Sequence, residues 1–156
     1  MLFTKIALFS CLLVLSSYAD FSPLKHKTCD HKGTILSVTA ENFEALKEGT
    51  KTVAKFKVGQ KPKIRIEFTA HSNSETMKNQ IKAKVEDNLL DFPQPGRNAC
   101  KFGVQCPVVA GQTQTFEQEI EIQDNQKGYN NIPVRWEIVN EKGESEVCII
   151  FLAKVV

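Results

Sequence analysis

The sequence has almost no net charge. Its 156 residues include 20 lysines and arginines against 18 aspartates and glutamates, which gives a formal charge of +2 at pH 7. Nucleic-acid-binding domains commonly have a basic stripe with aromatic side chains between the charges, and this chain has no such stripe. We therefore expect no nucleic-acid partner.

Signatures of catalysis are absent as well. The chain has no G-x-S-x-G nucleophile elbow and no glycine-rich loop of the kind that holds phosphate. Glu117, Glu119 and Glu121 alternate along one segment, but a glycosidase would need one of them in an apolar pocket. Three like charges at this spacing are more typical of a solvated sheet face. We predict a protein that is not an enzyme; a small secreted hydrolase is the alternative, which an ester assay would exclude.

Histidine is scarce, with three in the chain. His26, Cys29, Asp30 and His31 are residues of metal-ligating type, but zinc needs four ligands held tetrahedrally and no second cluster completes the set. His71 lies in a polar turn, where we expect a solvated side chain. The sequence thus predicts no metal site and no cofactor.

The first 19 residues have the features of a secretory signal peptide. Lys5 precedes an apolar run over residues 6–15, and the tripeptide Ser17-Tyr18-Ala19 supplies the small residues that a signal peptidase needs. The run is too short to span a bilayer. We expect residues 1–19 to be removed and residues 20–156 to form one secreted, extracellular, monomeric domain.

The cysteines predict two disulfides. Loss of the signal peptide removes Cys11 and leaves four cysteines, an even number in an exported chain. Four cysteines allow three pairings, and the short spacing favours a bond between Cys100 and Cys106. The remaining pair, Cys29 and Cys148, would tie the start of the mature chain to its last strand.

Apolar and polar residues alternate with period two along most of the chain, as in β-strands with one buried face. Residues 147–156 are apolar on both faces apart from Lys154, which predicts a central, covered strand. Residues 42–49 are the one helical candidate, with Asn42 as cap and Gly49 as terminator. Seven or so short strands with regular turns predict an all-β, immunoglobulin-like β-sandwich. The strands are expected at residues 34–39, 52–58, 63–68, 81–86, 116–122, 134–138 and 147–156.

The segment from Asp91 to the stapled loop carries the most specific local signals. Pro93 and Pro95 fix φ and lack an N–H, so they hold Phe92 on a stiff loop. Gly103, between the two close cysteines, is free to adopt a positive φ. We expect this pair of loops at one end of the sheet structure.

The bulky apolar faces leave two interpretations open. They either form a plain packed core, or they line a space between two splayed sheets that holds an apolar ligand. Patterning alone does not separate these, because the wall of a pocket and the wall of a core have the same sequence.

Several short motifs, in their order and spacing, resemble the ML family of secreted lipid-recognition domains. Within that family the similarity is to sterol carriers of the Niemann-Pick type C two kind and to mite group-two allergens. It extends over essentially the whole mature chain. The motifs are Cys29 with residues 33–36, residues 57–60, 67–69, 91–93, 100–108 and 134–138, and Cys148.

The resemblance implies a β-sandwich that holds a sterol, fatty acid or other lipid between its sheets without catalysis, and the same two disulfides. By position, Phe92 corresponds to an aromatic residue at the pocket mouth, Ile122 to an apolar wall residue and Tyr129 to a mouth tyrosine. The further residues expected to line or back the cavity are Phe68, Val85, Val108, Val134, Trp136 and Phe151.

The chain departs from the family pattern in two respects. Most relatives have a further disulfide between the first two strands, and residues 42–49 contain no cysteine. There is also no N-x-S/T sequon, which favours an extracellular carrier over a lysosomal one. We predict a secreted lipid carrier that delivers to a membrane or a receptor. The alternative is an innate-immune or chemosensory lipid-recognition protein that acts through a receptor.

Overall fold

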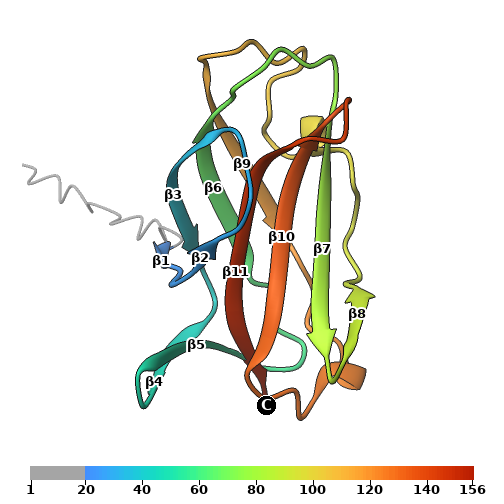
Figure 1. The fold of residues 1–156 in the computed structure, drawn as a ribbon. Coiled ribbons are helices and arrows are strands. Elements are labelled where there is room, and N and C mark those ends of the chain that lie inside the picture. Colours follow the sequence, from blue (N-terminus) through green and yellow to red (C-terminus); the bar gives the residue numbers. More distant parts are fainter. Residues whose placement is uncertain (1–19) are drawn as a thin grey trace, which may run out of the picture.

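In the computed structural model, which describes residues 20–156, two mainly antiparallel sheets pack face to face (Figure 1). The smaller sheet has the strand order β1-β3-β6-β9. The larger has the order β4-β5-β11-β10-β7-β8, with β2 paired to β11. The chain is therefore an all-β sandwich, as the sequence predicts. The strands are β1 Ser22–Pro23, β2 Lys27–Thr28, β3 Thr34–Ala40, β4 Glu44–Glu48, β5 Lys51–Phe56, β6 Lys63–Thr69, β7 Met77–Val85, β8 Asn88–Asp91, β9 Thr113–Glu119, β10 Ile132–Asn140 and β11 Ser145–Val155.

The alternating pattern produces the inner face of each sheet. In β6, Ile64, Ile66 and Phe68 are fully buried, while the charged residues between them stay partly exposed. β11 lies between β5 and β10, pairing in parallel with β5 and antiparallel with β10. Four consecutive residues of β11, from Glu146 to Ile149, are buried. The expectation of a central, covered last strand is confirmed.

The helix predicted for residues 42–49 is wrong. This segment forms β4, an edge strand that pairs antiparallel with β5 across a tight turn at Gly49, whose φ is +62°. Asn42 also has a positive φ and donates from Nδ2 to the carbonyl of Lys61 instead of capping a helix. Eight residues are too few for a helix to be stable without tertiary packing, and backbone pairing with β5 supplies hydrogen bonds that a solvated helical turn would lack.

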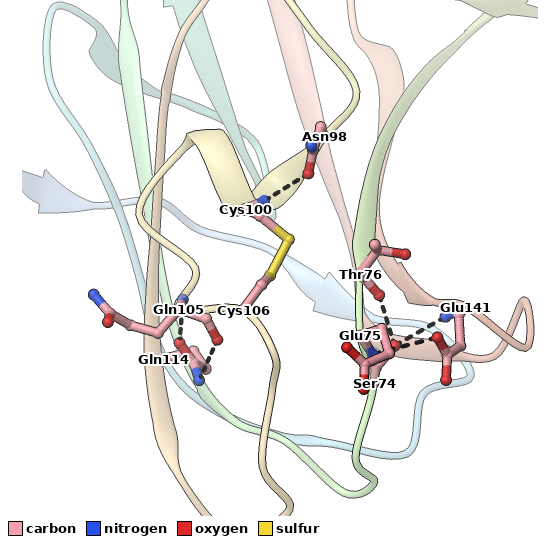
Figure 2. The surroundings of a disulfide bond; sticks show 9 residues. All are labelled: Ser74, Glu75, Thr76, Asn98, Cys100, Gln105, Cys106, Gln114 and Glu141. Atoms are coloured by element: carbon pink, nitrogen blue, oxygen red, sulfur yellow. Dashed lines mark hydrogen bonds between the residues drawn. A yellow bond between two sulfur atoms is a disulfide. The ribbon is translucent and has the colours of Figure 1, made fainter.

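Both expected disulfides are formed. Cys29 and Cys148 lie 5.0 Å apart between Cα atoms, and Cys100 and Cys106 lie 5.7 Å apart. The second bond closes the loop that contains the short 3₁₀ helix η1, Ala99–Lys101 (Figure 2). Gly103 in this loop has a φ of +96°, and a Cβ there would lie 2.5 Å from the carbonyl oxygen of Thr115, so the loop packs tightly against β9.

Phe92 and the stapled loop do not share one end of the sandwich, contrary to the sequence-based expectation. Residues 92–98 instead run beside the first half of β7, from the middle of that strand, where β8 ends, to the end where η1 lies (Figure 1). The backbone pairs at both ends of this run: Phe92 donates to Ile81 O at 2.9 Å, and Asn79 donates to Arg97 O at 2.7 Å. Pro93 and Pro95 break the ladder between these contacts, so the segment covers an edge without becoming a strand.

The strand predicted at residues 116–122 lies three residues earlier, as β9 Thr113–Glu119. Alternating burial continues past the strand end, and Ile120 and Ile122 remain buried. Their amides donate to Pro62 O and Gln60 O at 2.9 and 3.0 Å. Because Pro62 has no N–H to return, the regular ladder ends there, although the apolar face does not.

Candidate functional site

An apolar cavity lies between the sheets at the end of the sandwich where β7 and β11 finish and β10 begins. Its volume is about 30 Å³, and no polar atom contributes to its exposed lining. Strands of the larger sheet supply most of the walls. The segment that follows β9 of the smaller sheet, with Ile120 and Ile122, and the other connections at this end supply the rest. The lining residues are Phe56, Ile81, Ala83, Phe92, Ile120, Ile122, Tyr129, Ile132, Val134, Phe151, Ala153 and Val155.

Hydrogen bonds of the backbone position the outermost wall residues. The amide of Phe92 donates to β7, which holds the ring against the cavity from the edge. Tyr129 follows the 3₁₀ helix η2, Asp124–Gln126, and its carbonyl accepts from the amide of Val155 at 2.9 Å. Phe92, Tyr129 and Ile132 are partly exposed, unlike the deeper walls, so these three side chains stand between the cavity and solvent.

A larger surface groove lies over the same edge. It has a volume of about 300 Å³ and runs between residues 93–95 and residues 119–123. Ile120 belongs to the walls of both the groove and the cavity. The two spaces therefore adjoin, and the covering segments are connections rather than paired strands.

A polar clamp holds the rim on the β4 side. Glu48 accepts from Asn131 Nδ2 at 3.0 Å and from Lys154 Nζ at 3.1 Å. These contacts join β4 to β11 and to Asn131, the residue before β10. The hydrogen bond from Asn131 and then that from Lys154 hold the pKa of Glu48 below its ordinary value of 4.5.

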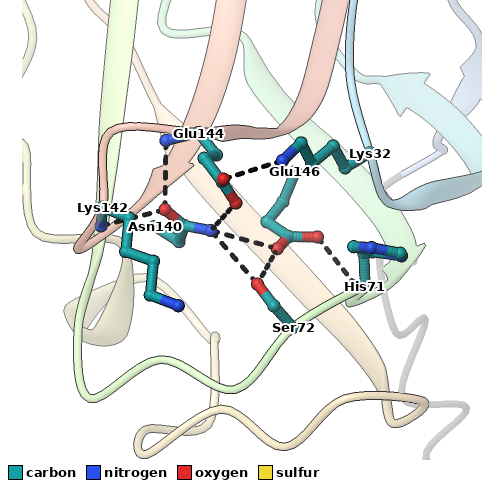
Figure 3. Close-up of polar contacts among 7 residues, drawn as sticks. All are labelled: Lys32, His71, Ser72, Asn140, Lys142, Glu144 and Glu146. Carbon is teal, nitrogen blue, oxygen red and sulfur yellow. Dashed lines mark hydrogen bonds and ion pairs between the residues drawn. The ribbon is translucent and has the colours of Figure 1, made fainter.

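The opposite end of the sandwich is closed by polar contacts (Figure 3). Glu146 is fully buried, and it accepts from the backbone N–H of His71 and from the hydroxyl of Ser72, both at 2.7 Å. Asn140 Nδ2 donates to Ser72 Oγ at 3.1 Å. This cluster joins the β6–β7 loop to the β10–β11 hairpin.

An ion pair at the surface, between Lys32 and Glu144 of this hairpin, lies beside the cluster. The hydrogen bond from Lys32 Nζ, at 2.7 Å, and a second from Asn140 hold the pKa of Glu144 below its ordinary value. The two ends of the sandwich thus differ in chemistry, and the apolar end is the candidate site.

The structure brings together five of the nine residues that the sequence assigns to a lipid site. Phe92, Ile122, Tyr129, Val134 and Phe151 line the cavity. The other four do not line it. Phe68, Val108 and Trp136 are buried elsewhere in the core, and Val85 is half-buried at the end of β7.

Seven wall residues were missed by the sequence assignment. Those on strands, such as Ile81 and Ala153, are inward positions of the alternating pattern, so their facing direction was readable. The pattern does not tell how far along the sandwich each of these residues lies from the apolar end, because the alternation is the same at both ends. Tertiary packing alone separates the cavity wall from the solid core.

The described residues include no group of three or more histidine, cysteine, aspartate or glutamate side chains placed to hold a metal ion. Cys29 is engaged in its disulfide, and His71 is exposed. Over residues 20–156, no helix has the length and apolarity to cross a membrane.

By its fold and cavity, the protein is a β-sandwich of immunoglobulin type with an apolar cavity at one end, between its sheets. A family profile described as the ML domain matches residues 24–155. The chain belongs to the ML domain family, and the resemblance noted in the sequence is confirmed.

Similar proteins come from several animals. "Putative protein heh-1" of Caenorhabditis elegans is 38% identical over 152 residues, which cover 97% of this chain and 98% of that protein. "NPC intracellular cholesterol transporter 2" of Bos taurus is 25% identical over 137 residues, 87% of each chain. The crystal structure of a Niemann-Pick type C2 protein from the Japanese carpenter ant matches with a TM-score of 0.73 at 17% identity. That match covers 85% of this chain and 100% of the ant protein and supports the fold alone.

Proposed function

We propose that this protein binds a lipid, a sterol or a fatty acid, between its two sheets and carries it through water to a membrane or a receptor. The observation that carries the proposal is the cavity, whose exposed lining is wholly apolar and comes from strands of the larger sheet and from the segments that close this end of the sandwich. Membership of the ML domain family and similarity to a bovine protein named as a cholesterol transporter support it. The ligand would be held without turnover.

The small volume of the cavity sets a condition on binding. Pockets for small ligands commonly have volumes of about 300–1,000 Å³, roughly ten to thirty times larger than the cavity of about 30 Å³ found here. A lipid would therefore enter by parting the walls. Since the facing side chains are apolar, parting them exchanges apolar contacts within the protein for apolar contacts with the ligand.

Desolvation of the ligand would supply the affinity. Burial of about 300 Å² of apolar surface at about 25 cal/mol/Å² gives roughly 7 kcal/mol before the costs of association and of opening the sheets. Such a balance fits reversible binding, which a carrier requires. The two disulfides fit an exported chain, and we propose a secreted, monomeric protein on that basis.

Phe92→Asp tests the proposed site. A carboxylate at the rim would have to be desolvated against the ligand, so the affinity for cholesterol and for palmitic acid should fall by about tenfold or more, which corresponds to about 1.4 kcal/mol. Leu89→Asp is the matched control, because Leu89 lies on β8 three positions earlier, is 52% exposed and does not line the cavity.

Native mass spectrometry and equilibrium binding would measure the affinities, with circular dichroism to verify the fold. A folded Phe92→Asp protein that binds as tightly as the wild type would exclude this cavity as the site. Absence of binding by the wild type to sterols and fatty acids alike would overturn the proposed function.

A further inference from the structure

A layer of buried polar side chains crosses the core beside the cavity. It consists of Asn79 on β7, Gln118 on β9 and Trp136 on β10, which are 0%, 1% and 0% exposed. Asn79 Nδ2 donates to Gln118 Oε1, and Trp136 Nε1 donates to Asn79 Oδ1 at 2.5 Å. Since β7 and β9 belong to different sheets, the first of these bonds ties the two sheets together through the core.

The segment that covers the edge of the sandwich completes the layer. Asn79 Nδ2 also donates to Gln94 Oε1 at 2.8 Å, and Gln118 Nε2 donates to Gly96 O at 2.9 Å. Each amide oxygen and nitrogen of Asn79 and Gln118, and the indole N–H of Trp136, therefore has a protein partner. Because each of these buried polar atoms already has a protein partner, an apolar ligand could enter the layer only by breaking those bonds, so the role of the layer toward such a ligand is to block.

The layer lies at the inner end of the cavity. Ile81, Ile120 and Val134, which line the cavity, each stand two residues from a member of the layer along the chain. Two residues is the spacing of successive inward positions on a strand. The layer is thus the next tier of the core, on the side of the cavity that faces the disulfide loop.

Parting the sheets has different consequences on the two sides of this boundary. Around the cavity, a lipid chain replaces one apolar contact with another. At the layer, parting the sheets separates Asn79 from Gln118, and a hydrocarbon chain cannot accept or donate the lost hydrogen bonds. The sheets should open up to the layer and no further.

We infer that the layer of Asn79, Gln118 and Trp136 is the inner stop of the ligand site and limits the length of apolar ligand that the protein accepts. The inference rests on the proposed function. From Asn79 to Val85 at the end of β7, six residues at about 3.3 Å each, the chamber is at most about 20 Å deep. Ligands of compact ring systems or moderate chain length fit this space, and very long acyl chains do not. Phe68 and Val108 remain in the closed core.

The test is the dependence of affinity on chain length, measured with lauric, palmitic, stearic and lignoceric acid. For the wild type, affinity should rise with each added methylene until the chain reaches the layer, and then stop rising. Gln118→Met keeps the side-chain volume, removes the bond between the sheets and leaves Asn79 paired with Gln94. This variant should bind lignoceric acid about tenfold more tightly than the wild type does and should bind lauric acid unchanged.

Gln114→Met is the matched control. Gln114 is on the same strand and is 2% exposed. Its side-chain Oε1 accepts from the Gln105 amide, and its Nε2 donates to the Gln105 carbonyl, in the disulfide loop (Figure 2). Its length profile should follow the wild type. Equal profiles for Gln118→Met and the wild type, or wild-type affinity that keeps rising through lignoceric acid, would overturn the stop while leaving lipid binding intact.

Hydrogen exchange on the wild type tests, without any variant, whether a bound ligand passes the layer. On addition of palmitic acid, protection should change for amides around Ile81 and Val134 and stay constant for amides around Phe68 and Val108. A change that spreads to the latter would show that the ligand passes the layer. If none of the acids and no sterol binds to the wild type, the proposed function fails and the stop fails with it.

Discussion

Glu146 shows how single residues close the end of the sandwich that faces away from the cavity. Its carboxyl oxygens accept from the His71 amide and the Ser72 hydroxyl in a site with no solvent exposure. The nearby backbone is equally constrained, because a Cβ on Gly33 would lie 2.5 Å from the carbonyl oxygen of Glu146. These contacts fix two loops and the hairpin in one arrangement.

Removal of this side chain should destabilise the fold without affecting ligand binding. Glu146→Ala takes the acceptor from the His71 amide and the Ser72 hydroxyl and leaves a hole where a fully buried side chain stood, which should lower the free energy of unfolding by about 3 kcal/mol. Urea denaturation measures the change. Glu141→Ala on the same hairpin removes an exposed carboxylate and should change stability by less than about 0.5 kcal/mol. A loss for Glu146→Ala no larger than this control would contradict the structural role.

At the scale of elements, β4 is an edge strand that pairs with β5 alone. Its edge is held by side chains: Lys55 pairs with Glu44 at 2.6 Å, and Lys154 with Glu48 at 3.1 Å. The bond from Lys55 holds the pKa of Glu44 below its ordinary value of 4.5. These lysine–glutamate contacts weaken when the carboxylates are protonated.

Acid should therefore loosen β4 and the rim that it clamps. Because the pKa of Glu48 is lowered in the folded state, its contribution to stability is complete above about pH 4.5 and is lost as pH falls through the folded value. Glu48→Gln should have a lower melting temperature than the wild type at pH 7, and the difference should shrink toward about pH 3.

The exposed Glu119 offers a control for the general effect of acid. Glu119→Gln should keep nearly the same offset from the wild type across the range. A constant offset for Glu48→Gln would show that the clamp does not depend on the charge of the carboxylate.

At the scale of the whole molecule, the two sheets are joined unevenly. Polar networks and the Cys100–Cys106 loop hold one end, and apolar side chains around a cavity of about 30 Å³ hold the other. The Cys29–Cys148 bond links the start of the described chain to the central strand of the larger sheet. We therefore expect the sheets to open at the apolar end and not at the other.

Such a molecule should bind its ligand through a step of opening. With cis-parinaric acid in a stopped-flow experiment, the observed association rate should level off at high ligand concentration, because opening of the sheets becomes limiting. Phe92→Ala, which removes a ring from the rim, should raise the plateau. Rates that increase linearly up to the diffusional range would mean that the site is open beforehand.

Much of the fold follows from local pattern. The alternation in residues 63–68 and 134–138 identifies β6 and β10, and the doubly apolar last segment identifies the covered strand. The pattern of residues 42–49 predicts a helix, because Phe43 and Leu46 are three residues apart and share a face only in a helix; pairing with β5 overrides this local preference. The prolines around Phe92 predict a loop at one end of the sheets, beside the stapled loop, because proline interrupts a strand; a segment that covers a sheet edge satisfies the same restriction, and the structure has that arrangement.

By itself, the sequence determined the two layers, the pairing of four cysteines and the family. Period-two alternation is a local pattern, and the short spacing of Cys100 and Cys106 leaves one pairing for the other two cysteines. Tertiary structure alone decided where along the sandwich the interior is solid and where it is hollow. Trp136 and Val134 have the same inward direction in the sequence pattern, yet one joins a polar layer and the other lines the cavity. The difference arises from partners on other strands, which are distant in the chain and meet only when both sheets have formed.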